Sequence, residues 1–301
     1  MHYTNKYNLP EWWVNALKFD DYDKEGDYSI TGLAQPVQMT ILEELCDDDI
    51  YVDVSEMAYI LGGRAIHMYL EHVEAKDTIR ERRLKTVIRN RTVTGKIDDY
   101  RLWDERLSDI KAASKWVIKR WQDTGRVKEE WEGQDNGYSF LLKENGYNTK
   151  SQFIEAWLRD WSMMEAARDP SMPQCQIAIV PVPFWGEEAT YDYLERRVYL
   201  HDTTPHRNLN LPHCTAEERW ERLTEWKVKK AANKTAYRGG AHFETEKAAQ
   251  TFLETKPIKD KPEIVKHLGE SVRCEHWCRV KAWCCQYEIA NSGGNDGFNG
   301  E

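Results

Sequence analysis

One stretch of the sequence, residues 94–114, places charged side chains on two adjacent predicted strands. Asp98 lies on the first strand, and Asp109 and Lys111 lie on the second. Residues i and i+2 of a strand point to the same face, so Asp109 and Lys111 share a face and Ile110 lies opposite. Two carboxylates and an ammonium that converge in this way suit a hard divalent cation with a water molecule activated beside it. The alternative is a solvated cross-strand charge set, which is common on protein surfaces.

Composition and charge restrict the class of protein. The 301 residues contain no apolar run near the roughly 20 residues that a membrane helix needs, and the N-terminus lacks an apolar signal-like region. We therefore expect a cytoplasmic protein without a membrane partner, in which seven cysteines are thiols or metal ligands rather than disulfides. The net charge of −9 disfavours nucleic acid as a partner, but Lys and Arg concentrate locally in residues 80–91 and 227–238.

The hydrophobic pattern predicts a mixed α/β fold in which a central mixed sheet is flanked by helices. We expect residues 1–28 to be an extension packed on the body, 29–290 to be a single domain with helical elaborations, and 291–301 to be a disordered tail. Strands are predicted at 84–100, 101–113, 149–160 and 175–184. Helices are predicted at 31–45, 54–76, 114–124, 128–145, 191–202, 215–226 and 247–253.

Three further motifs accompany the Asp109-x-Lys111 pair. Gly63-x-x-x-His67 lies upstream on a predicted helix, Gly95-x-x-Asp98 lies on the preceding strand, and Gln134-x-x-x-Tyr138 lies downstream. Residues four apart share one helix face, so Gln134 and Tyr138 point the same way. In this order, and over about residues 29 to 290, the four motifs resemble the PD-(D/E)xK nuclease superfamily, specifically its RecB-like exonuclease branch and related phage-type proteins.

The resemblance implies a restriction-endonuclease-like core and a metal-dependent deoxyribonuclease, more an exonuclease than an endonuclease, acting in DNA recombination, repair or replication. Asp98, Asp109 and Lys111 would be catalytic. His67, Asp98, Asp109 and the backbone carbonyl of Ile110 would bind Mg²⁺ or Mn²⁺, and Lys111 would orient the attacking water. Gln134 and Tyr138 would support the site or contact DNA. Asp98 is preferred to Asp99 because of its spacing from the glycine.

The resemblance also implies partners. The substrate would be single- or double-stranded DNA, a recombinase or a single-strand-binding protein would be a further partner, and a phage-encoded member would act in the cytoplasm of its bacterial host. The alternative is a non-catalytic nucleic-acid-binding protein on the same fold, with an iron–sulfur or zinc site as a structural element.

A cysteine cluster lies near the C-terminus. Cys274, Cys278, Cys284 and Cys285 fall within 12 residues, which in a cytosolic protein indicates a metal site. The resemblance implies a 4Fe–4S cluster bound by Cys274, Cys278 and Cys284, with Cys46 as the fourth ligand.

Two other interpretations of these cysteines remain open. Cys285 or His276 would complete a zinc site, because zinc takes four nitrogen or sulfur ligands. Without a metal, the thiols would simply be buried among aromatic residues. Cys175 and Cys214 are expected to be structural.

Overall fold

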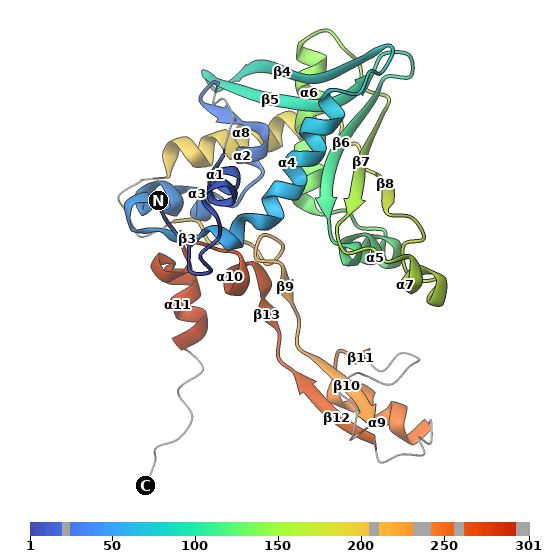
Figure 1. Cartoon of the computed structure of the whole chain (residues 1–301). Helices are drawn as coiled ribbons and strands as arrows, with labels where there is room; N and C mark the ends of the chain where they lie inside the picture. The colour runs from blue at the N-terminus through green and yellow to red at the C-terminus, as the bar shows by residue number, and fades with distance from the viewer. Residues whose placement is uncertain (20–24, 205–210, 231–241, 256–261, 293–301) are drawn as a thin grey trace. The chain divides into compact units, whose positions relative to one another are not determined.

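The computed structural model describes residues 1–19, 25–204, 211–230, 242–255 and 262–292. The chain divides into two compact units, Met1–Pro212 and His213–Glu301 (Figure 1). No helix in the described ranges has both the length and the apolar character that a membrane crossing requires. Residues 293–301, most of the predicted tail, lie outside the described residues, and residues 291 and 292 belong to the last helix.

Unit 1 is built on a mixed six-stranded sheet. Its order is β2-β5-β6-β7-β8, and β4 pairs with the other edge of β5. The pairs β2–β5 and β6–β7 are parallel, whereas β4–β5, β5–β6 and β7–β8 are antiparallel. The prediction of a central mixed sheet flanked by helices is confirmed. The strands are β2 (Tyr28–Ser29), β4 (Thr78–Ile88), β5 (Arg91–Arg101), β6 (Arg106–Ala113), β7 (Ser151–Leu158) and β8 (Ile177–Pro181).

Strands β4 and β5 form one long hairpin, and the single strand predicted at 84–100 is therefore wrong. The chain reverses at Arg89 and Asn90, whose φ angles are 49° and 60°. Two left-handed residues make the tight turn whose twist matches paired strands, and Asn adopts this conformation more readily than most residues. The turn sets the register, in which Ile88 faces Arg91 and Thr78 faces Arg101.

The other edge of β5 has a gap between two partners. Near its beginning, Val93 and Thr94 pair with β2. Near its end, residues 99–101 pair with residues 106–108 of β6. Between these pairings, the stretch Gly95–Asp98 has neither neighbour on that edge within the described chain. An interrupted edge leaves room for side chains from outside the sheet.

Helix α6 (Glu129–Glu144) fills much of one face of the sheet, where it contacts β4, β5, β6 and β7 (Figure 1). Acidic residues occupy its first turn, where they favour the positive end of the helix dipole. The helix ends before Gly146, whose φ of 87° suits a glycine after a helix C-terminus. Its apolar residues Leu141 and Leu142 are fully buried against Ile97 and Leu107 of the sheet.

The remaining elements of unit 1 surround this core. Strand β1 pairs in parallel with β3, so the N-terminal residues are tied to the body of unit 1. These elements are β1 (His2–Thr4), α1 (Glu11–Lys18), α2 (Ile30–Leu33), α3 (Val37–Leu45), η1 (Asp47–Asp49), β3 (Tyr51–Asp53), η2 (Val54–Met57), α4 (Ala58–Glu71), α5 (Lys115–Thr124), α7 (Met163–Arg168) and α8 (Glu187–Thr203).

Unit 2 contains a small sheet of order β11-β10-β12 and a second strand pair, β9–β13. Helix α9 packs on the small sheet through Ala249, which is buried with Val228. The elements are β9 (Glu221–Arg222), β10 (Glu225–Lys230), β11 (His242–Phe243), α9 (Glu246–Thr255), β12 (Pro262–His267), β13 (Glu270–Ser271), α10 (Val272–His276), η3 (Lys281–Trp283) and α11 (Cys285–Ser292).

The helix predicted at 215–226 is wrong. The capping box that suggested it does form, because the Glu218 amide donates to Thr215 Oγ1 and the Thr215 amide donates to Glu218 Oε2. A single turn follows and ends at Trp220, whose φ is 54°. The chain then enters β9 and β10, where pairing with β13 and β12 replaces helical hydrogen bonds. Tertiary strand pairing therefore overrides a correct local signal.

Candidate functional site

Three carboxylates lie in a row across β4, β5 and β6. In the hairpin, Arg80 faces Asp99 and Arg82 faces Ile97, so Glu81 stands opposite Asp98. On the other side, Asp99 faces Ser108 as the last paired position, and Asp98 and Asp109 would form the next pair. Beyond Asp99 the strands β5 and β6 separate, so the hydrogen-bonded pairing between them ends where the acidic residues begin.

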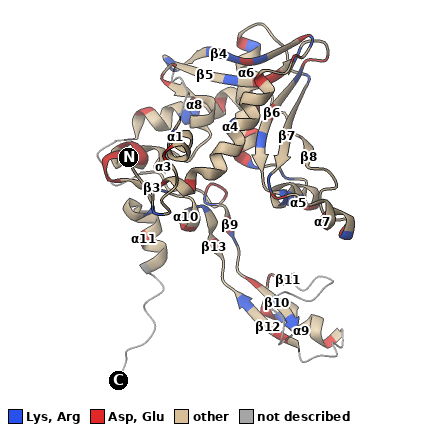
Figure 2. Cartoon of the chain, in the orientation of Figure 1, with Lys and Arg blue, Asp and Glu red and all other residues tan. Residues whose placement is uncertain are grey.

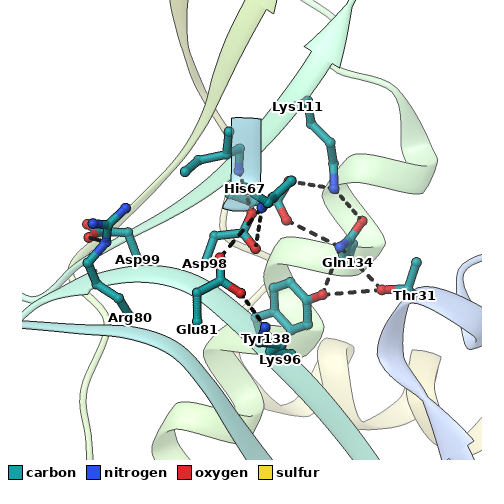
Figure 3. Close-up of polar contacts among 12 residues, drawn as sticks. Thr31, His67, Arg80, Glu81, Lys96, Asp98, Asp99, Lys111, Gln134 and Tyr138 are labelled. Carbon is teal, nitrogen blue, oxygen red and sulfur yellow. Dashed lines mark hydrogen bonds and ion pairs between the residues drawn. The ribbon is translucent and has the colours of Figure 1, made fainter. Parts of the chain in front are cut away.

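Asp98 occupies the centre of this row. Its Oδ2 atom accepts a hydrogen bond of 2.7 Å from the Ile110 amide, which ties the separated strands together. The His67 Nδ1 atom, on α4, lies 3.6 Å from Asp98 Oδ1 and 3.6 Å from Glu81 Oε1 (Figure 3). Ligand atoms of His67, Glu81 and Asp98 all lie within 4.8 Å of one another, close enough to share one cation.

Glu81 was missed by the motif analysis. Its φ of 49° places it in the left-handed region, and its Oε2 atom lies 2.7 Å from Lys96 Nζ. Strained backbone of this kind often occurs at functional sites. The register of the hairpin would have found it: once the two-residue turn at Arg89–Asn90 is known, Glu81 falls opposite Asp98.

Asp109 and Lys111 form a second polar group with α6. Lys111 Nζ lies 2.6 Å from Asp109 Oδ2 and donates a hydrogen bond of 3.0 Å to Gln134 Oε1. Gln134 Nε2 donates to Asp109 Oδ1 at 3.2 Å and to the Tyr138 hydroxyl at 2.8 Å. Thr31 Oγ1 lies 3.2 Å from the same hydroxyl (Figure 3). One amide thus holds both members of the Asp-x-Lys pair.

One of the two motif glycines, Gly95, allows a helix to approach these strands closely. A Cβ atom on Gly95 would lie 2.7 Å from both Leu141 Cδ1 and Tyr138 Cε1, so α6 packs directly on the backbone of β5. A Cβ atom on Gly63 of α4 would meet the Cβ of Ala112 at an ordinary 3.7 Å. The glycine of the Gly95-x-x-Asp98 motif therefore has a steric role beside the site.

Asp99 is directed to a different partner. Arg80 Nε lies 3.2 Å from Asp99 Oδ1, away from His67 and Lys111 (Figure 3). Neighbouring carboxylates on one strand thus enter separate environments, as strand alternation requires.

Burial and crowding change the acidity of the central groups. Burial, with the nearby charge of Asp109, raises the pKa of Asp98 from 3.8 to about 7. A hydrogen bond with Glu81 raises the pKa of His67, and Asp98 adds to the effect against the opposing effect of burial. Burial lowers the pKa of Lys111, but Asp109, Tyr138 and Asp98 together outweigh it and the net pKa is raised. Lys111 is therefore a permanent cation and not a proton acceptor.

Asp135 adds a fourth acid that the motif analysis gave no role. Its side chain is fully buried on α6, and neither carboxylate oxygen has a hydrogen-bond partner in the described part of the chain. Burial, followed by the Asp109 charge, raises its pKa well above the usual value. Asp135 therefore adds a fourth buried or half-buried carboxyl group to those of Glu81, Asp98 and Asp109.

These pKa shifts predict a pH-dependent stability. The pKa of Asp98 is raised from 3.8 to about 7, so folding favours its protonated form. Its stabilising contribution is complete below its unfolded pKa and is lost as pH rises through about 7. With a chelator present, the free energy of urea unfolding should fall from about pH 5 to about pH 8, and it should fall more in wild type than in Asp98→Asn. An equal pH dependence in the two proteins would contradict this assignment.

The basic run of residues 80–91 lies mainly on β4, among the Lys and Arg coloured blue there (Figure 2), and is largely neutralised in the structure. Four of its arginines pair with carboxylates: Arg80 with Asp99, Arg83 with Glu25, Arg89 with Glu195 and Arg91 with Asp202. In the second run, Lys227 and Lys229 pair with Glu225 and Glu263, and residues 231–238 lie outside the described chain.

The predicted metal-binding cysteines belong to different units. Cys46 follows α3 in unit 1. Cys274 lies on α10, and Cys278 and Cys284 flank η3, all in unit 2. None of the seven cysteines, all of which lie in the described ranges, forms a disulfide.

Comparison with known proteins does not assign the chain to a family. No protein-family model matches the chain, and no curated protein matches it. Among solved structures, one titled "Crystal structure of SSO0001" is similar, with 16% sequence identity and a TM-score of 0.43. The similarity covers 66% of this chain and 89% of that one.

Proposed function

We propose that the protein is a metal-dependent nuclease with a restriction-endonuclease-like core, and that it hydrolyses phosphodiester bonds in DNA as a RecB-like exonuclease of the PD-(D/E)xK type. One observation carries the proposal: ligand atoms of His67, Glu81 and Asp98 lie within 4.8 Å of one another, beside the Asp109–Lys111 pair. The order of the four motifs along the chain supports the same activity.

The residues of the site fit a hard divalent cation. Such cations prefer carboxylate and carbonyl oxygens, and Mn²⁺ also accepts imidazole. His67, Glu81, Asp98, Asp109 and the Ile110 carbonyl would hold Mg²⁺ or Mn²⁺. The pKa of Asp98 is raised first by burial and then by Asp109, and these effects outweigh the opposing charges of His67 and Lys111. A bound cation would add positive charge, lower the pKa of a water molecule and polarise the scissile phosphate.

The chain's own residues have separable roles in this reaction. Lys111, held as a cation by Asp109, donates hydrogen bonds to the attacking water and stabilises negative charge that develops on the phosphate oxygens. Gln134 accepts from Lys111 and donates to Asp109, which fixes the geometry of both groups. Tyr138 and Thr31 hold Gln134 in turn. Preorganised donors of this kind need little rearrangement during the reaction.

The direct test is a nuclease assay on end-labelled single- and double-stranded DNA, with Mn²⁺ or with EDTA. We expect Mn²⁺-dependent release of short products from ends by wild type and none in EDTA. Cleavage that persists in EDTA would contradict the proposal. DNA binding without cleavage in any metal would favour the alternative, a non-catalytic nucleic-acid-binding protein on this fold.

His67→Ala should weaken metal binding more than it disturbs folding. The imidazole lies 3.6 Å from two carboxylates and is partly exposed, so its removal leaves the strands and α6 in place. Calorimetry should show weaker Mn²⁺ binding, and excess Mn²⁺ should restore part of the activity. Unchanged Mn²⁺ affinity would assign His67 a structural role instead.

A further inference from the structure

Cys214, expected from the sequence to be structural, is held next to the C-terminal cysteines of unit 2. Its amide donates to Gln286 Oε1 at 2.9 Å, and Gln286 Nε2 donates to the Cys214 carbonyl at 2.9 Å. Gln286 follows Cys285 in the first turn of α11, two residues after Cys284. This reciprocal pair of hydrogen bonds keeps residue 214 beside the beginning of α11.

A second set of contacts connects the same loop with α10. Arg219 Nη1 donates to the Cys214 carbonyl at 2.6 Å, and the Arg219 carbonyl accepts from the Arg273 amide at 3.0 Å. Strands β9 and β13 pair directly beside this contact. The Arg273 carbonyl accepts from the Cys278 amide at 2.8 Å, so Cys274 and Cys278 lie on one turn of chain. Two regions distant in sequence, residues 214–219 and 273–286, thus meet at the cysteines.

The electrostatics of the thiols agree with this geometry. Burial raises the pKa of Cys214 to about 12, and after Glu218 the further causes are the charges of Cys284, Cys274 and Cys278. Burial also raises the pKa of Cys274, with Cys284 as the next cause. The three C-terminal cysteines that act on Cys214 are thus the ones beside which the hydrogen bonds hold residue 214.

We propose that Cys214, Cys274, Cys278 and Cys284 bind one metal centre through four thiolates. The set differs from the one that the family resemblance implies, because Cys214 takes the place of Cys46 and all four ligands belong to unit 2. Four thiolates suit either zinc or an iron–sulfur cluster. Among the described residues the only group with all ligand atoms within 4.8 Å is at His67, Glu81 and Asp98. A single zinc ion would therefore draw the four sulfur atoms closer together, whereas an iron–sulfur cluster binds each thiolate to a different iron and holds the sulfur atoms further apart.

Such a centre would stabilise the fold of unit 2. Between Cys214 and Cys274 the chain runs out through β9, β10 and α9 and returns through β12 and β13, a loop of 60 residues. A metal at the base would close this loop and reduce the entropy of the unfolded chain, a gain that grows slowly with loop length. Binding and folding of unit 2 would then be coupled.

Metal analysis of matched single variants tests the proposal. Full-length wild type, purified without oxygen, should contain either one zinc ion per chain or iron with acid-labile sulfide and a brown colour. Loss of a partner that only supports a ligand costs roughly 10–100-fold in affinity, so loss of a ligand should cost at least about 100-fold. Cys214→Ser should therefore lose its metal on dialysis, whereas Cys46→Ser and Cys285→Ser should keep it.

A second variant separates ligand loss from misfolding. Cys214→His supplies a nitrogen ligand and should retain zinc, with a circular dichroism spectrum like that of wild type. Retention of metal by Cys214→Ser, with loss from Cys46→Ser, would overturn the inference in favour of Cys46. Wild type without zinc or iron would also overturn it. Asp109→Asn should keep the thiolate-bound metal, so a failure of the nuclease proposal would be distinguishable from a failure of this one.

Discussion

Asp109→Asn should reduce Mn²⁺-dependent DNA cleavage by at least about 100-fold, the cost of losing a group that stabilises transition-state charge. The substitution keeps the shape of the side chain but removes its charge. It would replace a charged carboxylate ligand of the proposed cation with a neutral amide and remove the ion pair of 2.6 Å that holds Lys111 in place. Initial rates on end-labelled DNA at saturating Mn²⁺ measure the effect.

The adjacent strand offers a matched control. Asp99→Asn makes the same chemical change on the neighbour of Asp98, where the partner is Arg80 rather than the cation site. It should retain cleavage and Mn²⁺ affinity. Lys111→Ala should lose cleavage activity as Asp109→Asn does, because each substitution removes one partner of the same ion pair. Full activity in Asp109→Asn or Lys111→Ala would exclude this group of residues as the active site.

Gly95→Ala should destabilise unit 1 by about 1–3 kcal/mol, the usual cost of adding a methyl group to a tightly packed core. The new Cβ atom would lie 2.7 Å from ring carbon Tyr138 Cε1 and 2.7 Å from Leu141 Cδ1. Both side chains are buried, so α6 must shift away from β5. Urea unfolding monitored by circular dichroism gives the change in stability.

Gly62→Ala is the control for this prediction. No atom lies within 4 Å of a Cβ atom built at Gly62, which lies within α4. Alanine is favoured over glycine inside a helix by about 1 kcal/mol, so this variant should be at least as stable as wild type. The Gly95→Ala variant should also lose activity, because Tyr138 positions Gln134 through a hydrogen bond of 2.8 Å. Equal stability of the two variants would contradict the close packing of α6 on Gly95.

Local patterns predicted some parts of the fold well and others poorly. The helix predicted at 128–145 corresponds to α6, because apolar periodicity and a terminal glycine are both local signals. The strand predicted at 84–100 ignored the turn at Arg89 and Asn90, since neither residue is a glycine and the strand pattern continues through both. The helix predicted at 215–226 followed a real capping box, but the decisive strand partners lie some 45 residues further along the chain.

Local sequence patterns likewise predicted some residues of the site, whereas others depended on contacts between distant parts of the chain. Alternation within β6 placed Asp109 and Lys111 together, and helical spacing placed Gln134 and Tyr138 on one face, as the structure has them. Glu81 required the register of the hairpin, which depends on recognising its turn. Cys214 required the folded arrangement of unit 2, in which its contact with Gln286 joins residues 72 positions apart.

The tight turn between β4 and β5 also restricts how this chain can evolve. Surface turns usually tolerate insertions and deletions. Here Arg89 and Asn90 alone connect the strands, and side chains alternate between faces, so a slip of one residue would exchange the faces of the hairpin. Either direction of slip would bring Arg80 or Arg82 opposite Asp98 in place of Glu81. A guanidinium would then stand where the proposed cation would bind. We therefore expect changes in the length of this turn to be as rare among functional variants as substitutions of the acidic residues themselves.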